Sequence, residues 1–305
     1  MEPLISFGLR HQTILFSIVG LVLGIEVTWL ASTDRLLSRF GRLKMLFVGS
    51  VLGIAIGSVV GQLEPLPNTL ALQFPDPICH SGSRKLILFI HGWNGDPQNT
   101  WRKYPQLICE DPDFADTEVL SLGYPTFVVQ RNLLIEDTAS WINERLIPHG
   151  ISHYQRIVFV THSIGGLIAR EMLMQMNLAG RPELKRIGMI LEFGTPHLGA
   201  ANYAQLATAL GLPGSDIIEE VKPESGFLHS LEANWNQFEL RPRSYCYTSP
   251  QDWLVSETSA LFQCDPPNHK FPDVDHRDLV KPDTRNDDRY SIPMDSVKHF
   301  MLAQP

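Results

Sequence analysis

The chain has 305 residues, a net charge of −8 and a hydrophobic content of 44%. This length suits one large α/β domain with an additional segment, and an acidic balance without a basic stripe argues against nucleic-acid binding. The four cysteines show no C-x-x-C spacing, so we expect no zinc site and no thioredoxin-like redox chemistry. We also expect no cofactor. Their even number permits disulfides, although the spacing does not decide whether they form (Cys79, Cys109, Cys246 and Cys264).

The amino-terminal quarter carries two apolar segments, 13–31 and 45–63, each about the length of a helix that crosses a bilayer. The first contains Glu26, and the second has a glycine at every fourth position, which lets another helix approach closely. Residues 1–63 therefore predict a membrane hairpin of two transmembrane helices. The alternatives are a secretory signal peptide for the first segment, although no small-x-small cleavage site follows it, and a buried helix for the second.

The link between the two apolar segments sets the expected orientation. Residues 32–44 hold four basic residues and one acidic residue, and the positive-inside rule places such a link in the cytoplasm. The rest of the chain is then expected at the membrane on its non-cytoplasmic side. Residues 64–84, which contain four prolines, predict a semi-rigid linker.

Residues 85–305 alternate between strand-like and helix-like stretches. Short apolar runs are typical of strands that are buried on both faces, and repeated β–α alternation implies a mostly parallel sheet with helices on both faces. In such sheets, active sites lie at the carboxyl ends of the strands. The predicted strands are 86–90, 118–122, 156–160, 187–193 and 244–247, and the predicted helices are 99–109, 133–147 and 164–177.

The first strand is followed by the turn His91-Gly92-Trp93. After an early strand of a hydrolase, an H-G-x turn supplies one backbone N–H of an oxyanion hole. The expected donors are the backbone N–H groups of Trp93 and Ile164, and Gly92 lets the backbone approach the substrate closely. The alternative is an ordinary strand-ending turn with a structural histidine at position 91.

The central strand is followed by Ser163, and a helix with small residues at its start begins at Ile164. A serine on so tight a turn is a nucleophile elbow, whose strained backbone needs small side chains two positions away. In the G-x-S-x-G pattern of this elbow, Thr161 replaces the first glycine and Gly165 supplies the second. The alternative is a serine that only caps the helix.

An acid and a base should follow the serine, since the triad order in this fold is serine, acid, histidine. Asp252 follows the last predicted strand and is the preferred acid, and His276 is the preferred base. The acid holds the imidazole in one tautomer and stabilises the imidazolium. Rival bases and acids stay open at this point (His269 and His299; Asp275 and Glu257).

Further residues are candidates for the substrate pocket. His162 precedes the serine, and Thr195 and His197 lie in a loop that ends the strand 187–193. We expect these residues, with His91 and Gly92, to shape the pocket rather than to titrate in it. Residues 201–237 are either a cap over the active site with an apolar acyl pocket or an additional pair of surface helices.

From about Lys85 to Tyr290 the chain resembles the lipase-like α/β-hydrolases of the GPI-inositol-deacylase and serine-active-site-containing esterase group. The resemblance lies in five blocks in one order: 91–96 with 99–101, 161–166, 193–199, Asp252 with Val255 ahead of 259–260, and Asp275-His276 ahead of 281–282. It implies the α/β-hydrolase fold, a triad of Ser163, Asp252 and His276, and tolerance of threonine at position 161.

The resemblance also implies hydrolysis of a carboxylic ester, with a lipid ester as the favoured case. The amino-terminal hairpin lies outside it. Two classes of function are therefore expected: a membrane-anchored serine esterase or lipase, and a catalytically silent scaffold that binds a lipid or protein partner. The sequence predicts no nucleic-acid partner and leaves the oligomeric state open.

Overall fold

The structure is a computed structural model, and it describes residues 76–93, 95–124, 134–146, 150–200, 202 and 216–303. All of these residues belong to one compact unit, Leu70–Pro305. The predicted hairpin (1–63), most of the predicted linker and part of the predicted cap lie outside the described residues. Within the described ranges, no helix has both the length and the apolar character that a membrane span requires.

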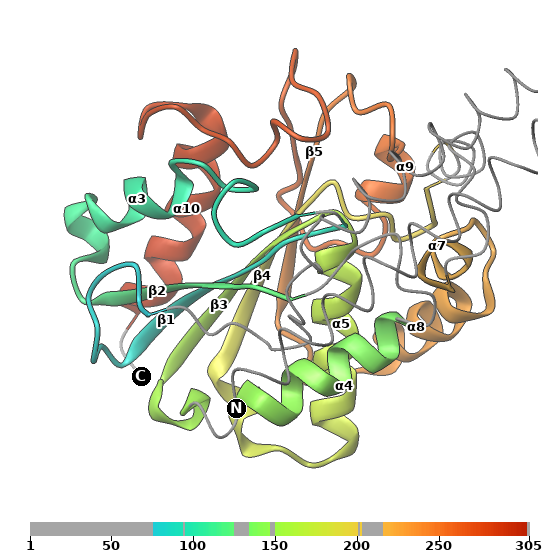
Figure 1. Cartoon of the computed structure of the whole chain (residues 1–305), viewed down its shortest axis with the longest axis horizontal. Helices are drawn as coiled ribbons and strands as arrows, with labels where there is room; N and C mark the ends of the chain where they lie inside the picture. The colour runs from blue at the N-terminus through green and yellow to red at the C-terminus, as the bar shows by residue number, and fades with distance from the viewer. Residues whose placement is uncertain are drawn as a thin grey trace, which may run out of the picture. The chain divides into compact units, whose positions relative to one another are not determined.

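The described unit is built on a sheet of six parallel strands in the order β2-β1-β3-β4-β5-β6 (Figure 1). The five predicted strands are all present, within two residues at each end. The sixth has only two residues, too few for a periodic pattern. The strands are β1 (Lys85–Ile90), β2 (Thr117–Leu122), β3 (Arg156–His162), β4 (Ile187–Phe193), β5 (Arg243–Thr248) and β6 (His269–Lys270).

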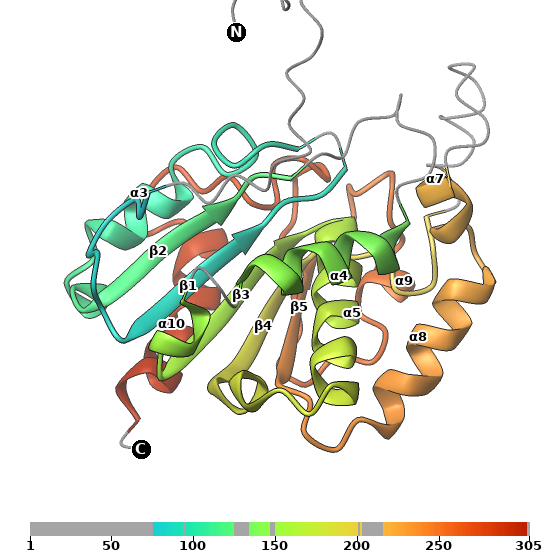
Figure 2. The same cartoon turned by 60° about the horizontal axis from the view of Figure 1, so that its bottom comes forward.

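Helices cover both faces of the sheet, as the sequence predicted (Figures 1 and 2). Leu86, Leu88 and Ile90 of β1 share one hydrophobic cluster with the helices of the first face. Ile87 and Phe89 point to the opposite side and pack with the helices of the second, which is the alternation expected of a strand buried on both faces. The first face carries α4 (Ile135–Leu146), α5 (Ile164–Leu178) and α8 (Gly226–Gln237), and the second carries α3 (Tyr104–Cys109) and α10 (Asp288–Leu302).

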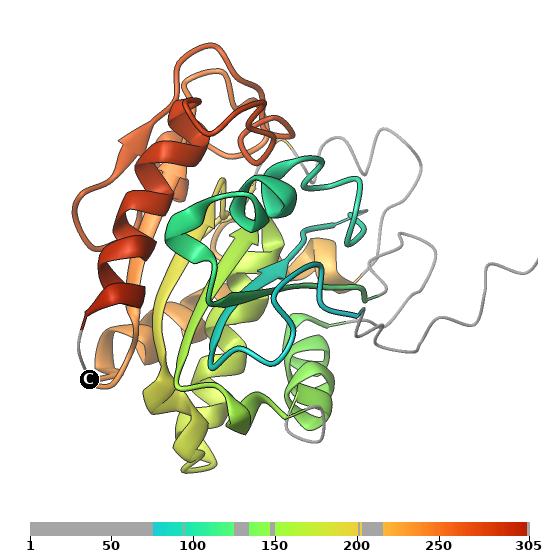
Figure 3. The same cartoon turned by 90° about the vertical axis from the view of Figure 1, so that its left-hand side faces the viewer.

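Several helices differ from the prediction. The helix predicted at 99–109 begins only at Tyr104, because residues 97–103 form turns and Arg102 has a positive φ of 49°. The long helix α10, the red helix at the left of Figure 3, was not predicted, since it contains Pro293. Shorter helices were also missed: α7 (Asp216–Glu220), α9 (Glu257–Ala260), and the 3₁₀ turns η1 (Pro112–Phe114), η2 (Ile151–His153) and η3 (Pro182–Arg186).

Two disulfides join the four cysteines. Cys79 is bonded to Cys109, and Cys246 is bonded to Cys264. The first closes a loop that contains the turn after β1, and the second closes a loop that contains Asp252. Each disulfide therefore limits the freedom of one loop that carries a predicted site residue.

Candidate active site

Ser163 lies on a sharp turn between β3 and α5. Its backbone has φ 57° and ψ −132°, a conformation that L-residues with side chains rarely adopt. The turn is held by two backbone hydrogen bonds, from Ser163 N–H to Phe193 O at 2.9 Å and from Gly166 N–H to Ser163 O at 3.0 Å. Ser163 occupies the N-cap position of α5, but its hydroxyl makes no capping hydrogen bond. The local geometry therefore matches a nucleophile elbow better than a simple helix cap.

Two glycines let the turn after β1 lie against this elbow. A Cβ atom on Gly92 would lie 2.7 Å from both His162 O and the Cβ of Ser163. A Cβ atom on Gly165 would overlap the carbonyl oxygens of Ile90 and His91. The backbone that leads to Trp93 thus packs directly on the start of α5. The first N–H groups of a helix have no acceptor within the helix, which suits the N–H of Ile164 to bind an oxyanion.

Asp252 and His276 form a buried pair. The Nδ1 of His276 lies 2.7 Å from Oδ2 of Asp252, and Oδ1 of Asp252 accepts hydrogen bonds from the backbone N–H groups of Leu254 and Val255, both at 3.0 Å. Because a carboxylate only accepts, the proton between Asp252 and His276 belongs to Nδ1 of the neutral imidazole. The Nε2 atom is then left as a base.

Ser163 and His276 line the same cavity, whose volume is about 270 Å³. Trp93 and His162 also line it. The other wall residues were not predicted from the sequence to line the pocket. Most of them are close neighbours of predicted site residues along the chain, and that proximity is the signal that could have found them (Gly95, Asp96, Asn99, Thr100, Trp253, Leu254, Arg277 and Lys281).

The rival acids and bases do not line this cavity. His269 stacks on Tyr247, with ring centroids 6.3 Å apart, and His299 is exposed on α10 beside Asp295. Glu257 pairs with Lys270 at the surface, and Asp275 accepts hydrogen bonds from backbone N–H groups of its own loop. Of the candidate acids and bases, only Asp252 and His276 form a pair whose imidazole lines the cavity of Ser163.

Of the five predicted pocket residues, only His162 is on the described wall of the cavity. His91 and Gly92 belong to the turn after β1 but do not line the cavity. The imidazole of His91 stacks on the ring of Tyr124, with centroids 4.2 Å apart, and burial lowers the pKa of His91 to about 4. Thr195 is fully buried and packs against Gly166. A Cβ atom on Gly166 would overlap the side chain of Thr195. These three positions support the site from below rather than contact the cavity.

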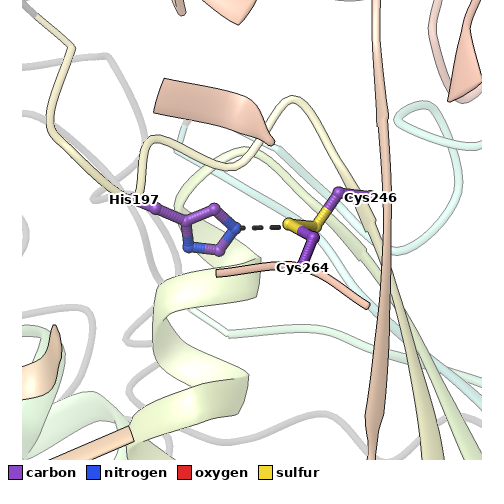
Figure 4. Close-up of side chains that lie close together, drawn as sticks. All are labelled: His197, Cys246 and Cys264. Carbon is purple, nitrogen blue, oxygen red and sulfur yellow. Dashed lines mark hydrogen bonds between the residues drawn. A yellow bond between two sulfur atoms is a disulfide. The ribbon is translucent and has the colours of Figure 1, made fainter. Parts of the chain in front are cut away.

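His197 lies in a separate place, next to the disulfide of Cys246 and Cys264 (Figure 4). Its Nε2 is 3.9 Å from the Sγ of Cys246 and 3.4 Å from Oε2 of Glu192. Burial, and to a lesser degree the nearby Arg170, hold the pKa of His197 well below its usual value, so this contact is not an ion pair at neutral pH. Because both sulfurs are in the disulfide, they offer no thiolate to a metal ion.

The comparisons with known proteins agree with the resemblance described above. Residues 80–227 match a family described as "Putative serine esterase (DUF676)"; this range includes Ser163 and ends before Asp252. A search of curated protein sequences finds no match. Among solved structures, the mature form of the Bacillus licheniformis lipase BlEst2 is 16% identical, with a TM-score of 0.54 over 74% of this chain and 97% of that one.

The propeptide form of the same lipase is also 16% identical, with a TM-score of 0.52 over 77% of this chain and 54% of that chain. At this level of identity, the likeness shows the fold and nothing finer. The parallel sheet covered by helices is therefore of the α/β-hydrolase type, as the sequence predicted.

Proposed function

We propose that this chain, whose residues 80–227 match the serine-esterase family, hydrolyses a carboxylic ester through a covalent acyl-enzyme on Ser163. One observation carries the proposal. A serine on a strained strand-to-helix turn and an imidazole paired with a buried carboxylate line a single cavity of about 270 Å³. This is the arrangement that serine hydrolysis needs: a nucleophile, a base and an acid that orients the base.

In the first half of the reaction, Ser163 Oγ attacks the ester carbonyl carbon while Nε2 of His276 takes the hydroxyl proton. Asp252 holds Nδ1–H and stabilises the imidazolium that forms. The negative charge moves to the carbonyl oxygen, where the backbone N–H groups of Trp93 and Ile164 are the proposed donors. The C–O bond to the alcohol then breaks, and the imidazolium gives its proton to the leaving oxygen.

In the second half, water replaces the alcohol. His276 takes a proton from the water, the hydroxyl attacks the acyl carbon, and the bond to Ser163 Oγ breaks as the serine recovers its proton. The products are a carboxylic acid and an alcohol, and the protein returns to its first state.

A fluorophosphonate probe tests the chemistry directly, because it forms a covalent bond only with an activated serine. We expect labelling of the full chain and loss of labelling in Ser163→Ala. Ser259→Ala is the matched control, since Ser259 is buried in α9, where its hydroxyl accepts a hydrogen bond from Leu198 N–H and donates one to Gly199 O. No labelling of folded protein would favour the alternative function, a silent scaffold that binds a lipid or protein partner.

We also propose that residues 1–63 anchor the protein in a membrane, with the hydrolase domain on the non-cytoplasmic side. The two apolar segments and the basic link between them support the anchor and its direction. The two disulfides support the same side, because disulfides persist mainly in oxidising compartments. We expect the full chain to stay with membranes during extraction in alkaline carbonate; release into the supernatant would contradict the anchor.

A lipid ester is the substrate that we favour. An anchored enzyme meets esters at the bilayer, and the apolar side chains of Trp93, Trp253 and Leu254 line the cavity. Trp253 is 49% exposed, so it is available to an acyl chain. We expect Trp253→Ala to lower turnover of long-chain esters more than turnover of acetyl esters. Equal losses for both would argue against a lipid substrate.

A further inference from the structure

The loop that carries His276 has no secondary structure of its own, so contacts with other segments must hold its backbone in place. It runs from the end of β6 to the start of α10, residues 271–287, and contains no helix or strand. Catalysis is sensitive to small displacements: moving a reacting group by 1 Å can cost about a hundredfold in rate. The hydrogen bond that Nδ1–H donates to Asp252 orients the ring of His276, but a ring can also move with its backbone.

The backbone of His276 has a second anchor. The Nε2 of His162 lies 2.9 Å from the carbonyl oxygen of His276, and the two rings are 4.8 Å apart between centroids. A carbonyl oxygen only accepts hydrogen bonds, so Nε2 of His162 must carry the proton. His162 directly precedes Ser163, and so two consecutive residues supply the nucleophile and a contact to the loop of the base.

The surroundings of His162 keep it neutral and in place. Its side chain is buried. The rings of His162 and Trp101 meet edge to face, with their centroids 6.4 Å apart. Burial lowers the pKa of His162 well below its usual value, and the neighbouring His276, Lys281 and His91 lower it further, while the hydrogen bond to His276 acts in the opposite direction. A neutral imidazole has one N–H to donate, and here the geometry directs it to the loop.

We propose that His162 is a positioning residue, which donates its Nε2–H to the carbonyl oxygen of His276 and thereby holds the base against the cavity that contains Ser163. This inference rests on the proposed esterase function. His162 moves no proton in the reaction. Its effect is on the rate of the chemical step, because it fixes where the imidazole of His276 stands.

Two substitutions at one position separate this role from a general contribution to folding. His162→Phe keeps a planar ring and removes the donor, whereas His162→Gln keeps an N–H at a similar reach and is neutral at every pH. We expect His162→Phe to lower kcat by about 30- to 100-fold with KM changed less than about threefold, and His162→Gln to recover at least about tenfold of that loss. Thermal unfolding of each full chain, read by circular dichroism, shows whether both are folded.

A merely structural role would lower activity equally in both variants, and that result would overturn the inference. Fluorophosphonate labelling of the wild-type chain that persists unchanged in His162→Phe would also overturn it, while leaving the esterase function intact. Absence of labelling in the wild type would overturn both.

A measurement on the wild-type protein covers the case in which His162→Phe does not fold. Nitrogen-15 NMR of labelled histidine distinguishes the two imidazole tautomers, and the signals of His162 are those missing from His162→Gln. We expect a neutral ring with the proton on Nε2 between pH 6 and 8. A proton on Nδ1, or a charged ring in this range, would overturn the inference.

Discussion

Asp252–His276 and Glu192–His197 are both buried pairs of a carboxylate and an imidazole, but their surroundings differ. Glu192 is already bound by Arg170, whose Nη2 and Nε lie 2.8 and 3.1 Å from its two oxygens, and it also accepts a hydrogen bond from Ser244. In the part of the chain that the structure describes, Asp252 contacts no arginine or lysine; its partners are His276 and two backbone N–H groups.

The cavities beside the two imidazoles differ as well. His276 shares about 270 Å³ with Ser163, whereas His197 and Arg170 line a space of about 10 Å³, which is too small for a substrate. A carboxylate next to a histidine is therefore not enough to indicate catalysis. The carboxylate must have no arginine or lysine partner that neutralises it, so that its charge stabilises the imidazolium. The second ring nitrogen must also lie near a nucleophile in an open cavity.

The largest expected effect is on catalysis, from Asp252→Asn. An amide at this position favours the wrong imidazole tautomer, so we expect kcat to fall by about 10³- to 10⁴-fold, measured on a soluble ester. The matched change in the other pair, Glu192→Gln, should leave kcat of the folded protein within about threefold, since Glu192 is not near the cavity. Comparable losses of kcat in the two variants would erase the distinction between the pairs.

The fold and the grouping of Ser163, Asp252 and His276 could be predicted from the sequence for different reasons. The buried parallel strands are short apolar runs, such as 187–193, which the structure reproduces as β4 without change. Ser163, Asp252 and His276 follow from local motifs and from their order along the chain, and the structure brings them together although 113 residues separate the first from the last. The local sequence pattern and the order of motifs along the chain were sufficient to select these strands and these three residues.

What could not be predicted depends on contacts between distant segments. The pairing of Cys246 with Cys264 and the neutralisation of Glu192 by Arg170 leave no local signal. His197 was expected near the substrate because it follows a strand, but its side chain turns toward Glu192 and the disulfide instead. The helix α10 was missed because Pro293 lies inside it, although its buried positions Tyr290, Met294, Val297 and Met301 have helical spacing.

The second prediction concerns stability and tests the buried ion pair of Arg170 and Glu192. Arg170 is 2% exposed, and its guanidinium also lies over the ring of Trp235 at 4.6 Å. Arg170→Met leaves Glu192 as a buried charge without its partner, so we expect a loss of about 3–5 kcal/mol in the free energy of unfolding by urea. The double variant Arg170→Met/Glu192→Leu removes both charges and should recover most of that loss. If the double variant is as unstable as the single one, the ion pair is not the cause.

The third prediction uses pH to distinguish buried from exposed imidazoles. The pKa of His91 is lowered from its ordinary value of 6.5 to about 4 in the folded protein, so between these values the unfolded chain binds a proton that the folded chain does not. The contribution of neutral, buried His91 to the free energy of unfolding is therefore fully present above about pH 6.5. It is lost as the pH decreases toward 4, and the loss from His91 alone is about 3 kcal/mol.

Urea unfolding at pH 7.5, 6 and 5 measures the part of this loss that occurs above pH 5, about 2 kcal/mol. His91→Gln should show a shallower dependence on pH, while His299→Gln, which changes a side chain that is 80% exposed, should follow the wild type. A pH dependence that is identical in all three proteins would mean that His91 is not buried in its neutral form.

The smallest effect is expected from His197→Gln. Arg170 already neutralises Glu192, and the neutral imidazole of His197 makes only long contacts, 3.4 Å to Glu192 and 3.9 Å to Cys246. We expect a change of about 1 kcal/mol in the free energy of unfolding and a kcat within about twofold of the wild type on esters of any chain length. The pH dependence should again be shallower, because the pKa of His197 is also lowered in the folded state. A loss of kcat that grows with acyl-chain length would indicate that His197 contacts the substrate. The two carboxylate–imidazole pairs would then belong to one site.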